Sequence, residues 1–427
     1  MTILEEVTAL QDKALSNVAS IKNLQTMCDR FGHRLSGSDA LERTLDWLEK
    51  QLKQDRFDHV VRQPVWVPVW VRGNESAVLL TPRSHKLAML GLGGSIGTGK
   101  RGLEAAVIPV TDFADLQRKA KLVDGNIVLF NVPFTSYGET VSYRVTGAVA
   151  AARCGAVAAI IRSVGPASLS TPHTGSMSYS DGVTKIPTCA VSIEDATLLE
   201  RLYTSGYAPR VRLKMDAHMK PDRKSSNIWA EVKGSTYPDE VIAVGGHIDS
   251  WDVGQGAQDD GGGCCAAWEA LKQVRVLGQP KRTIRVVFWV NEENGTRGAD
   301  AYAKHVAEKK EVHRLLIESD IGITKPLSIG ISTRKSGDFQ RIAKELEPLL
   351  RQNLLMSVVQ GGGGADIGPT GLLGYPTAAL NADTDQYWNL HHTNADTFDK
   401  INPADFRKCV AALATVAWWA SASDVSI

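Results

Sequence analysis

Between Glu240 and Asp320 the chain reads Val241-Ile-Ala-Val-Gly-Gly-His247, then Thr283-Ile-Arg-Val-Val-Phe-Trp-Val-Asn-Glu292-Glu293, then Leu315-Leu-Ile-Glu-Ser-Asp320. Each of these short apolar runs ends in acidic or imidazole side chains. Short apolar β-branched runs bounded by turn residues are typical of buried strands in a parallel sheet. In an open α/β sheet, ligands bind outside the carboxyl ends of the strands. The pattern therefore predicts one site at that edge of a sheet.

The side chains expected at this edge could bind a metal ion. They are His247, Asp259, Glu292, Glu293 and Asp320, with a further candidate in Leu390-His391-His392-Thr-Asn-Ala-Asp396-Thr. Taken singly, a histidine after a strand is more often hydrogen-bonded structure, and a lone carboxylate is usually a solvated surface group. Several carboxylates at one rim repel each other unless a cation lies among them. Two histidines and three carboxylates form the mixed nitrogen and oxygen ligand set that suits zinc.

Longer strings of sequence resemble a known family. The segments Gly245-Gly-His-Ile-Asp-Ser-Trp-Asp-Val-Gly-Gln-Gly-Ala-Gln-Asp-Asp-Gly-Gly-Gly263, Asn291-Glu-Glu-Asn-Gly295, Glu318-Ser-Asp-Ile-Gly322 and His391-His-Thr-Asn-Ala-Asp-Thr397 are similar to the active-site segments of the co-catalytic zinc exopeptidases. That family includes bacterial zinc aminopeptidases and glutamate carboxypeptidases. The similarity is strongest to its carboxypeptidase Q (plasma glutamate carboxypeptidase) branch. It extends to Arg34-Leu-Ser-Gly-Ser38 and Thr171-Pro-His-Thr-Gly175, and covers nearly the whole chain.

The resemblance implies a role for each candidate at a site with two zinc ions per chain. Asp259 bridges the ions, His247 and Asp320 complete one, and Glu293 and His392 complete the other. Relatives often have a cis peptide bond between the residues that match Asp259 and Asp260. Glu292 is expected to be the general base that takes a proton from the metal-activated water and delivers one to the leaving amine. Asp249 suits the carboxylate that fixes the tautomer of the His247 imidazole.

A hydrogen-bond donor to the tetrahedral oxyanion is harder to assign. Related aminopeptidases use a tyrosine in the loop before the residue that matches Asp366, but this chain has Gly361-Gly-Gly-Gly364 there. Glutamate carboxypeptidases instead place a tyrosine immediately before the last histidine ligand, where this chain has His391. His391 is therefore a candidate donor, with structural packing beside His392 as the alternative and a backbone amide of the glycine run as a further one.

The rest of the chain indicates three segments. Residues 1–73 are expected to begin a catalytic domain, 74–217 to form a protease-associated insert, and 218–427 to complete the catalytic domain. The insert has short strand-like runs, none of which ends in clustered acids or histidines. By resemblance the fold class is α/β, the phosphorylase/hydrolase-like mixed sheet of zinc exopeptidases flanked by helices, with a β-rich insert that acts as a structural lid or limits substrate length.

Local signals predict several elements. A helical stripe formed by Leu41, Leu45, Leu48 and Leu52 starts at a capping box made by Asp39 and Glu42. Strands are expected at 60–71, 76–80, 105–110, 126–130, 156–161, 228–232 and 375–380, and helices at 143–154, 261–274 and from Asn402-Pro403 to about Trp419.

Composition excludes some classes. Lysine and arginine number 48 against 47 acidic residues, a formal net charge of +1, so nothing indicates nucleic acid or an anionic membrane as partner. No signal peptide is visible, and the apolar segment 409–422 is shorter than the ~20 residues that span a bilayer. By resemblance a secreted or lysosomal location and a homodimer are expected, with the cytoplasm as the alternative location.

The expected activity is hydrolysis of dipeptides or short peptides. The alternatives are an aminopeptidase acting on longer peptides and a non-catalytic receptor-like relative. Receptor-like relatives differ in that they have lost metal ligands. All five candidate ligands are present in this chain.

Overall fold

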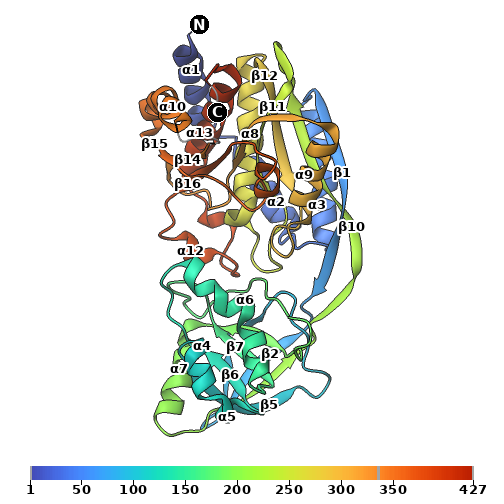
Figure 1. Ribbon diagram of the computed structural model, residues 1–427, viewed down its shortest axis with the longest axis vertical. Coiled ribbons are helices and arrows are strands. Elements are labelled where there is room, and N and C mark those ends of the chain that lie inside the picture. Colours follow the sequence, from blue (N-terminus) through green and yellow to red (C-terminus); the bar gives the residue numbers. More distant parts are fainter. Residues whose placement is uncertain (1, 334–336, 426–427) are drawn as a thin grey trace. The chain divides into compact units, whose positions relative to one another are not determined.

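The computed structural model describes residues 2–333 and 337–425. The chain divides into two compact units (Figure 1). The first unit comprises Met1–Val67, Asp222–Tyr387 and Asp396–Ile427. The second comprises Pro68–Pro221 together with Trp388–Ala395, so the segment that holds His391 and His392 groups with the second unit.

A mixed sheet forms the centre of the first unit. Within the described residues it has eight strands, in the order β1 (His59–Val71), β10 (His218–Val232), β12 (Arg282–Trp289), β11 (Tyr237–His247), β13 (Val312–Glu318), β16 (Thr377–Ala382), β14 (Pro326–Ser332) and β15 (Ser357–Gln360). Strand β11 runs parallel to β12 and β13, and β13 runs parallel to β16. Strand β10 is antiparallel to β12, and β14 is antiparallel to β16. The prediction of buried parallel strands at the three apolar runs is confirmed.

Helices cover both faces of this sheet. They are α1 (Ile3–Ser16), α2 (Lys22–Phe31), α3 (Asp39–Gln54), α8 (Gly262–Leu277), α9 (Arg297–Lys309), α10 (Asp338–Leu354), α11 (Gly368–Gly371) and α13 (Pro403–Ala422), with α12 (Tyr387–Leu390) at the unit boundary. On one face, Ile242 and Val244 of β11 join a core that includes residues of α1, α2, α3, α8, α10 and α13. On the other face, Ala243 joins a smaller core with Tyr302 and Val306 of α9. Because neighbouring residues of a strand point to opposite faces, one apolar run serves both cores.

The first and last helices of this unit lie side by side (Figure 1). Gln11 of α1 is fully buried, and its Nε2 donates to Thr415 Oγ1 of α13 at 3.1 Å. Trp418 Nε1 of α13 donates to Glu6 Oε2 at 3.0 Å. Although α13 has 20 residues, no helix in the described part of the chain is long and apolar enough to cross a membrane.

The second unit contains a separate sheet. Its described strands follow the order β3 (His85–Leu87), β2 (Glu75–Thr81), β9 (Arg210–Met215), β5 (Leu103–Val110), β6 (Ile127–Phe130), β7 (Ala158–Arg162), β8 (Thr188–Val191) and β4 (Met89–Gly91). Strands β5 to β8 are parallel neighbours. The helices are α4 (Phe113–Arg118), α5 (Ala120–Val123), α6 (Tyr137–Arg153) and α7 (Ile193–Thr204). The strand-like runs predicted in this region all form strands.

Two predicted helix starts need correction. Helix α3 is capped by Ser38, whose side chain accepts from Leu41 N, and not by Asp39, which is the first residue of the helix. Helix α6 begins at Tyr137, six residues before the predicted start, because Ser136 caps it by accepting from Glu139 N. The prediction for α13 is confirmed, since Asn402 Oδ1 accepts from Ala404 N and Asp405 N.

Candidate functional site

The loops after three parallel strands carry most of the predicted site residues. His247 is the last residue of β11, Glu292 and Glu293 lie in the turn after β12, and Asp320 follows β13 by two residues. Because β12, β11 and β13 are adjacent and parallel, their carboxyl ends share one edge of the sheet. The fold of the first unit therefore brings these residues to the same edge.

Three of the predicted site residues, His247, Asp259 and Asp320, form a group that could hold a metal ion. His247 Nε2 lies 3.2 Å from Asp259 Oδ1 and 3.1 Å from Asp320 Oδ1. One possible ligand atom from each residue lies within 4.8 Å of the others. Burial by itself lowers the pKa of His247, but Asp320 and Asp259 raise it well above its ordinary value. One imidazole nitrogen and two carboxylate oxygens, converging where His247 and Asp259 are buried, are a donor set that fits zinc.

The two adjacent aspartates make different contacts. Asp259 lies in the five-residue turn η1 (Ala257–Gly261), where its backbone is not helical, and it belongs to the group above. Asp260 is fully buried, and its Oδ2 accepts from His247 N at 3.1 Å while its Oδ1 accepts from Gly263 N at 3.0 Å. The peptide bond between them is cis, as relatives of this sequence type led us to expect. Asp260 thus hydrogen-bonds to the backbone that carries His247 and to the start of α8.

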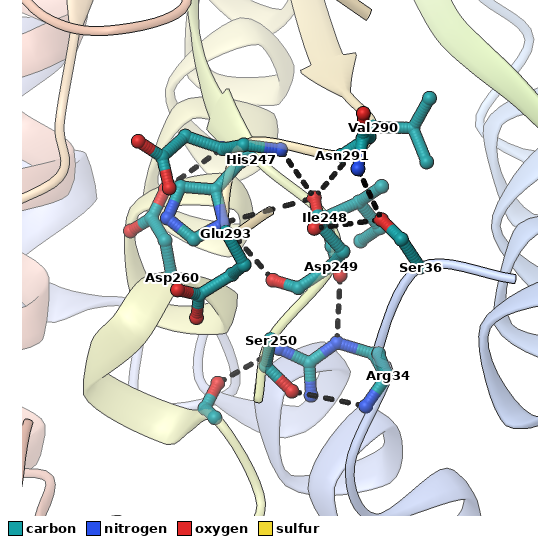
Figure 2. Close-up of polar contacts among 12 residues, drawn as sticks. Arg34, Ser36, His247, Ile248, Asp249, Ser250, Asp260, Val290, Asn291 and Glu293 are labelled. Atoms are coloured by element: carbon teal, nitrogen blue, oxygen red, sulfur yellow. Dashed lines mark hydrogen bonds and ion pairs between the residues drawn. The ribbon is translucent and has the colours of Figure 1, made fainter. Parts of the chain in front are cut away.

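Asp249 makes contacts other than those predicted. His247 Nδ1 lies 3.0 Å from the main-chain oxygen of Asp249, whereas the nearest oxygen of the Asp249 carboxylate is 3.9 Å away. The carbonyl, and not the carboxylate, is therefore the acceptor that fixes the tautomer of His247. The carboxylate instead accepts from Ser36 Oγ and from the main-chain N–H of Asn291 (Figure 2). It also accepts from the main-chain N–H of Glu292.

The turn after β12 holds the predicted base and one predicted ligand. Glu293 Oε1 accepts from Trp251 N at 3.1 Å, which fixes its carboxylate beside the loop after β11. Burial raises the pKa of Glu292 well above its ordinary value; His247 opposes this shift, and Asp320 and Glu293 add to it. A buried carboxylate with a shifted pKa beside a metal-ligand group is typical of a functional site.

Two further buried carboxylates, those of Asp396 and Glu318, fix main-chain segments of the first unit. Asp396 Oδ1 accepts from Ala257 N and Gln258 N, and its Oδ2 accepts from Asp259 N, so it holds the turn η1. Glu318 Oε2 accepts from Asp366 N and Ile367 N. Neither carboxylate was among the predicted site residues. The spacing of Glu318 and Asp320 was an available signal, because residues two apart on an extended chain point to the same side.

His391 and His392 lie in the second unit. Their rings stack with centroids 3.5 Å apart, and His391 makes edge contacts with Tyr137 and Trp388. His392 Nδ1 lies 3.3 Å from Thr174 O and 3.4 Å from Arg144 Nη1. The Thr174 carbonyl suits an Nδ1–H donor, which leaves Nε2 as the nitrogen available to a metal ion.

Comparison with known proteins places this site in a family. Residues 227–417 match the model of peptidase family M28, a span that includes all eight predicted site residues. Carboxypeptidase Q of Xenopus laevis is 44% identical over 402 residues, which cover 93% of this chain and 85% of that protein. The chain belongs to peptidase family M28. It is a metallopeptidase, and the matched span contains the His247, Asp259 and Asp320 group.

Solved structures agree with this assignment. A peptidase M28 precursor from Shewanella amazonensis superposes with a TM-score of 0.95 at 34% identity, covering 100% of this chain and 98% of that one. A zinc aminopeptidase from Bacillus subtilis superposes with a TM-score of 0.70 at 19% identity, covering 95% and 96%. The second likeness establishes a shared fold, which is the mixed α/β architecture described above.

Proposed function

We propose that this M28 peptidase is a di-zinc exopeptidase that hydrolyses dipeptides or short peptides. The observation that carries the proposal is the buried group of His247, Asp259 and Asp320 at the carboxyl edge of the sheet, with Glu292 in the adjoining turn. The relatives named carboxypeptidase Q and the zinc aminopeptidase of the same fold support this activity and this metal.

Each residue has a proposed role. By resemblance to the family, His247 and Asp320 would hold one zinc ion, Glu293 and His392 would hold the other, and Asp259 would be shared between them. Two bound zinc ions would supply Lewis-acid chemistry, polarising the scissile carbonyl and lowering the pKa of the attacking water. Glu292 takes the proton of that water on its carboxylate and returns a proton to the leaving amine.

The surrounding residues keep these groups in place. The main-chain oxygen of Asp249 accepts from Nδ1 of His247, so Nε2 faces Asp259 and Asp320. Asp396 holds the backbone from Ala257 to Asp259, and Asp260 accepts from the main-chain N–H groups of His247 and Gly263. We further propose that His391 donates a hydrogen bond to the tetrahedral oxyanion, with packing against Tyr137 and Trp388 as its alternative role.

We propose that residues 74–217, which lie within the second unit, form the protease-associated insert between catalytic segments 1–73 and 218–427, and that this insert restricts the length of the substrate. This rests on the resemblance of segment 74–217 and on fold-level analogy. A homodimer and a secreted or lysosomal location stay predictions of the same kind.

The experiment is a peptide panel on purified protein. Dipeptides and tripeptides with free and blocked termini are incubated with protein whose zinc content has been measured, and products are read by mass spectrometry. About two zinc ions per chain with cleavage of free dipeptides supports the proposal. Removal of single N-terminal residues from longer peptides would favour an aminopeptidase. Zinc absence together with no hydrolysis would favour a receptor-like protein.

A further inference from the structure

The segment Arg34-Leu-Ser-Gly-Ser38 has no role in the proposed reaction, although it is part of the resemblance. It joins α2 to α3, and both Arg34 and Ser36 are buried. Ser36 Oγ donates to Asp249 Oδ2 at 3.0 Å. Ser36 Oγ also accepts from Asn291 Nδ2 at 3.3 Å. A single hydroxyl therefore connects the loop after β11 to the turn after β12 (Figure 2).

The other oxygen of Asp249 closes a ring of hydrogen bonds. Asp249 Oδ1 accepts from Asn291 N at 2.7 Å and from Glu292 N at 3.2 Å. The ring runs from Ser36 to the Asp249 carboxylate, then to the backbone of Asn291, and returns through the Asn291 side chain to Ser36. Charge-assisted bonds of this kind, with an ionised acceptor, are stronger than neutral ones. The backbone of Glu292, the proposed base, is held by the same Asp249 oxygen.

The turn needs such an anchor because of its conformation. Asn291 has φ of 72°, in the left-handed region that costs most residues energy, and it is fully buried. Its side chain also contacts Asn294 Oδ1, and its Oδ1 accepts from Arg297 N at 3.3 Å. Surrounding contacts have to hold a backbone in this region.

Arg34 fixes the segment that carries Ser36. Its Nε donates to Ile248 O at 2.8 Å, its Nη1 to Gln255 O at 2.6 Å and its Nη2 to Gly256 O at 2.8 Å. These acceptors are main-chain oxygens of the loop that joins His247 to Asp259. The guanidinium is a rigid planar fork, so it fixes the segment on that loop in one orientation.

We propose that Ser36 is a positioning residue for the general base: through Asp249 it fixes the backbone of Asn291 and Glu292, and so sets where the Glu292 carboxylate stands. This inference rests on the proposed function, because it assumes that Glu292 is the base. The proposed mechanism assigns Ser36 no contact with the reacting atoms. It acts through two intermediates, the Asp249 carboxylate and the Asn291–Glu292 peptide.

The chain offers a matched control two residues away. Ser36→Ala removes both bonds of the hydroxyl and leaves the methylene in place. Ser38→Ala, in the same segment, removes the α3 cap that accepts from Leu41 N. For Ser36→Ala we expect kcat to fall roughly 10- to 100-fold with KM and zinc content unchanged, the usual effect of losing a residue that orients a catalytic group. For Ser38→Ala we expect a lower melting temperature with kcat at the wild-type level.

Two further measurements separate positioning from general loss of structure. Amide hydrogen exchange of the metal-free protein should become faster at Asn291–Glu293 in Ser36→Ala and stay unchanged there in Ser38→Ala. In a Glu292→Gln background, Ser36→Ala should cause almost no additional loss, because its effect passes through the residue already removed. If Ser36→Ala does not fold, Asn291→Gly tests the same ring, since glycine suits the positive φ and removes the amide donor to Ser36.

The opposing outcomes are distinct. The inference is overturned if Ser36→Ala and Asn291→Gly both keep wild-type kcat, if Ser36→Ala loses zinc, or if its loss of kcat is equally large in the Glu292→Gln background. Normal turnover of Glu292→Gln alone would instead remove Glu292 as the base and contradict the proposed function, whatever exchange shows at Asn291.

Discussion

Replacing His313 by glutamine should reduce the pH dependence of stability in the first unit. His313 lies on β13 beneath Tyr302, whose hydroxyl is 3.0 Å from its Nε2, and it is almost fully buried. Burial, with the nearby Arg285 guanidinium adding to the effect, lowers the pKa of His313 from 6.5 to about 3. Glutamine can keep a contact with Tyr302 and does not titrate.

Proton binding by His313 determines whether stability rises or falls with pH. Between pH 6.5 and 3 the unfolded chain takes up a proton at His313 that the folded chain excludes, so stability falls as the pH drops. The contribution is fully present above pH 6.5 and is lost progressively below it. From pH 6.5 to pH 5, full exclusion of one proton corresponds to a loss of roughly 1.5–2 kcal/mol in the free energy of unfolding.

The assay is urea unfolding of the metal-free protein at these two pH values, followed by tryptophan fluorescence. The metal-free form is used because zinc binding depends on pH by itself. The difference between the two pH values should be smaller in His313→Gln than in the wild type by roughly 1.5–2 kcal/mol. Tyr302→Phe, which keeps the imidazole, should retain the wild-type dependence. An unchanged difference in His313→Gln would refute the reasoning.

Three predictions concern the proposed site. Glu292→Gln should keep its zinc and lose roughly 10²- to 10⁴-fold in kcat, the worth of a positioned general base, as stopped-time peptide assays and metal analysis can measure. Asp259→Ala should lose most bound zinc and Asp260→Ala should retain more, because Asp260 contacts the backbone of His247 and not the ligand group; the reverse order would mean that Asp260 is the shared ligand. His391→Phe keeps an aromatic ring at this position and removes the hydrogen-bond donor, so kcat should fall while zinc content and fold stay intact. Unchanged kcat would assign the role of oxyanion donor to a backbone amide of residues 361–364.

The elements that carry the site could be predicted because their signals are local. A continuous apolar run such as Val241–Val244 indicates by itself a strand that is buried on both faces. In an open parallel sheet, the residue that ends such a strand lies at the ligand-binding edge. His247, Glu292, Glu293 and Asp320 were placed at that edge for this reason. The cap of α13 by Asn402 is of the same local kind.

The contacts that support the site could not be predicted because they depend on tertiary geometry. Sequence spacing put Asp249 near His247, but it could not show that the carbonyl faces the imidazole while the carboxylate faces the turn at Asn291. Nor did it link Ser36 to residues more than 200 positions later. At α3, Ser38 and Asp39 are both good caps, and only the backbone angle of Ser38, at ψ 154°, decides between them.

The pairing of α1 with α13 has a consequence for how the protein is made. Core residues of the first unit come from both ends of this chain, so the unit cannot close until α13 has left the ribosome. Most of the second unit, residues 68–221, is synthesised about 200 residues earlier and has its own core. During that interval the apolar face of α1 that packs against α13 lacks this partner. We therefore expect nascent chains stopped before residue 403 to contain a protease-resistant second unit attached to a first unit that chaperones still bind.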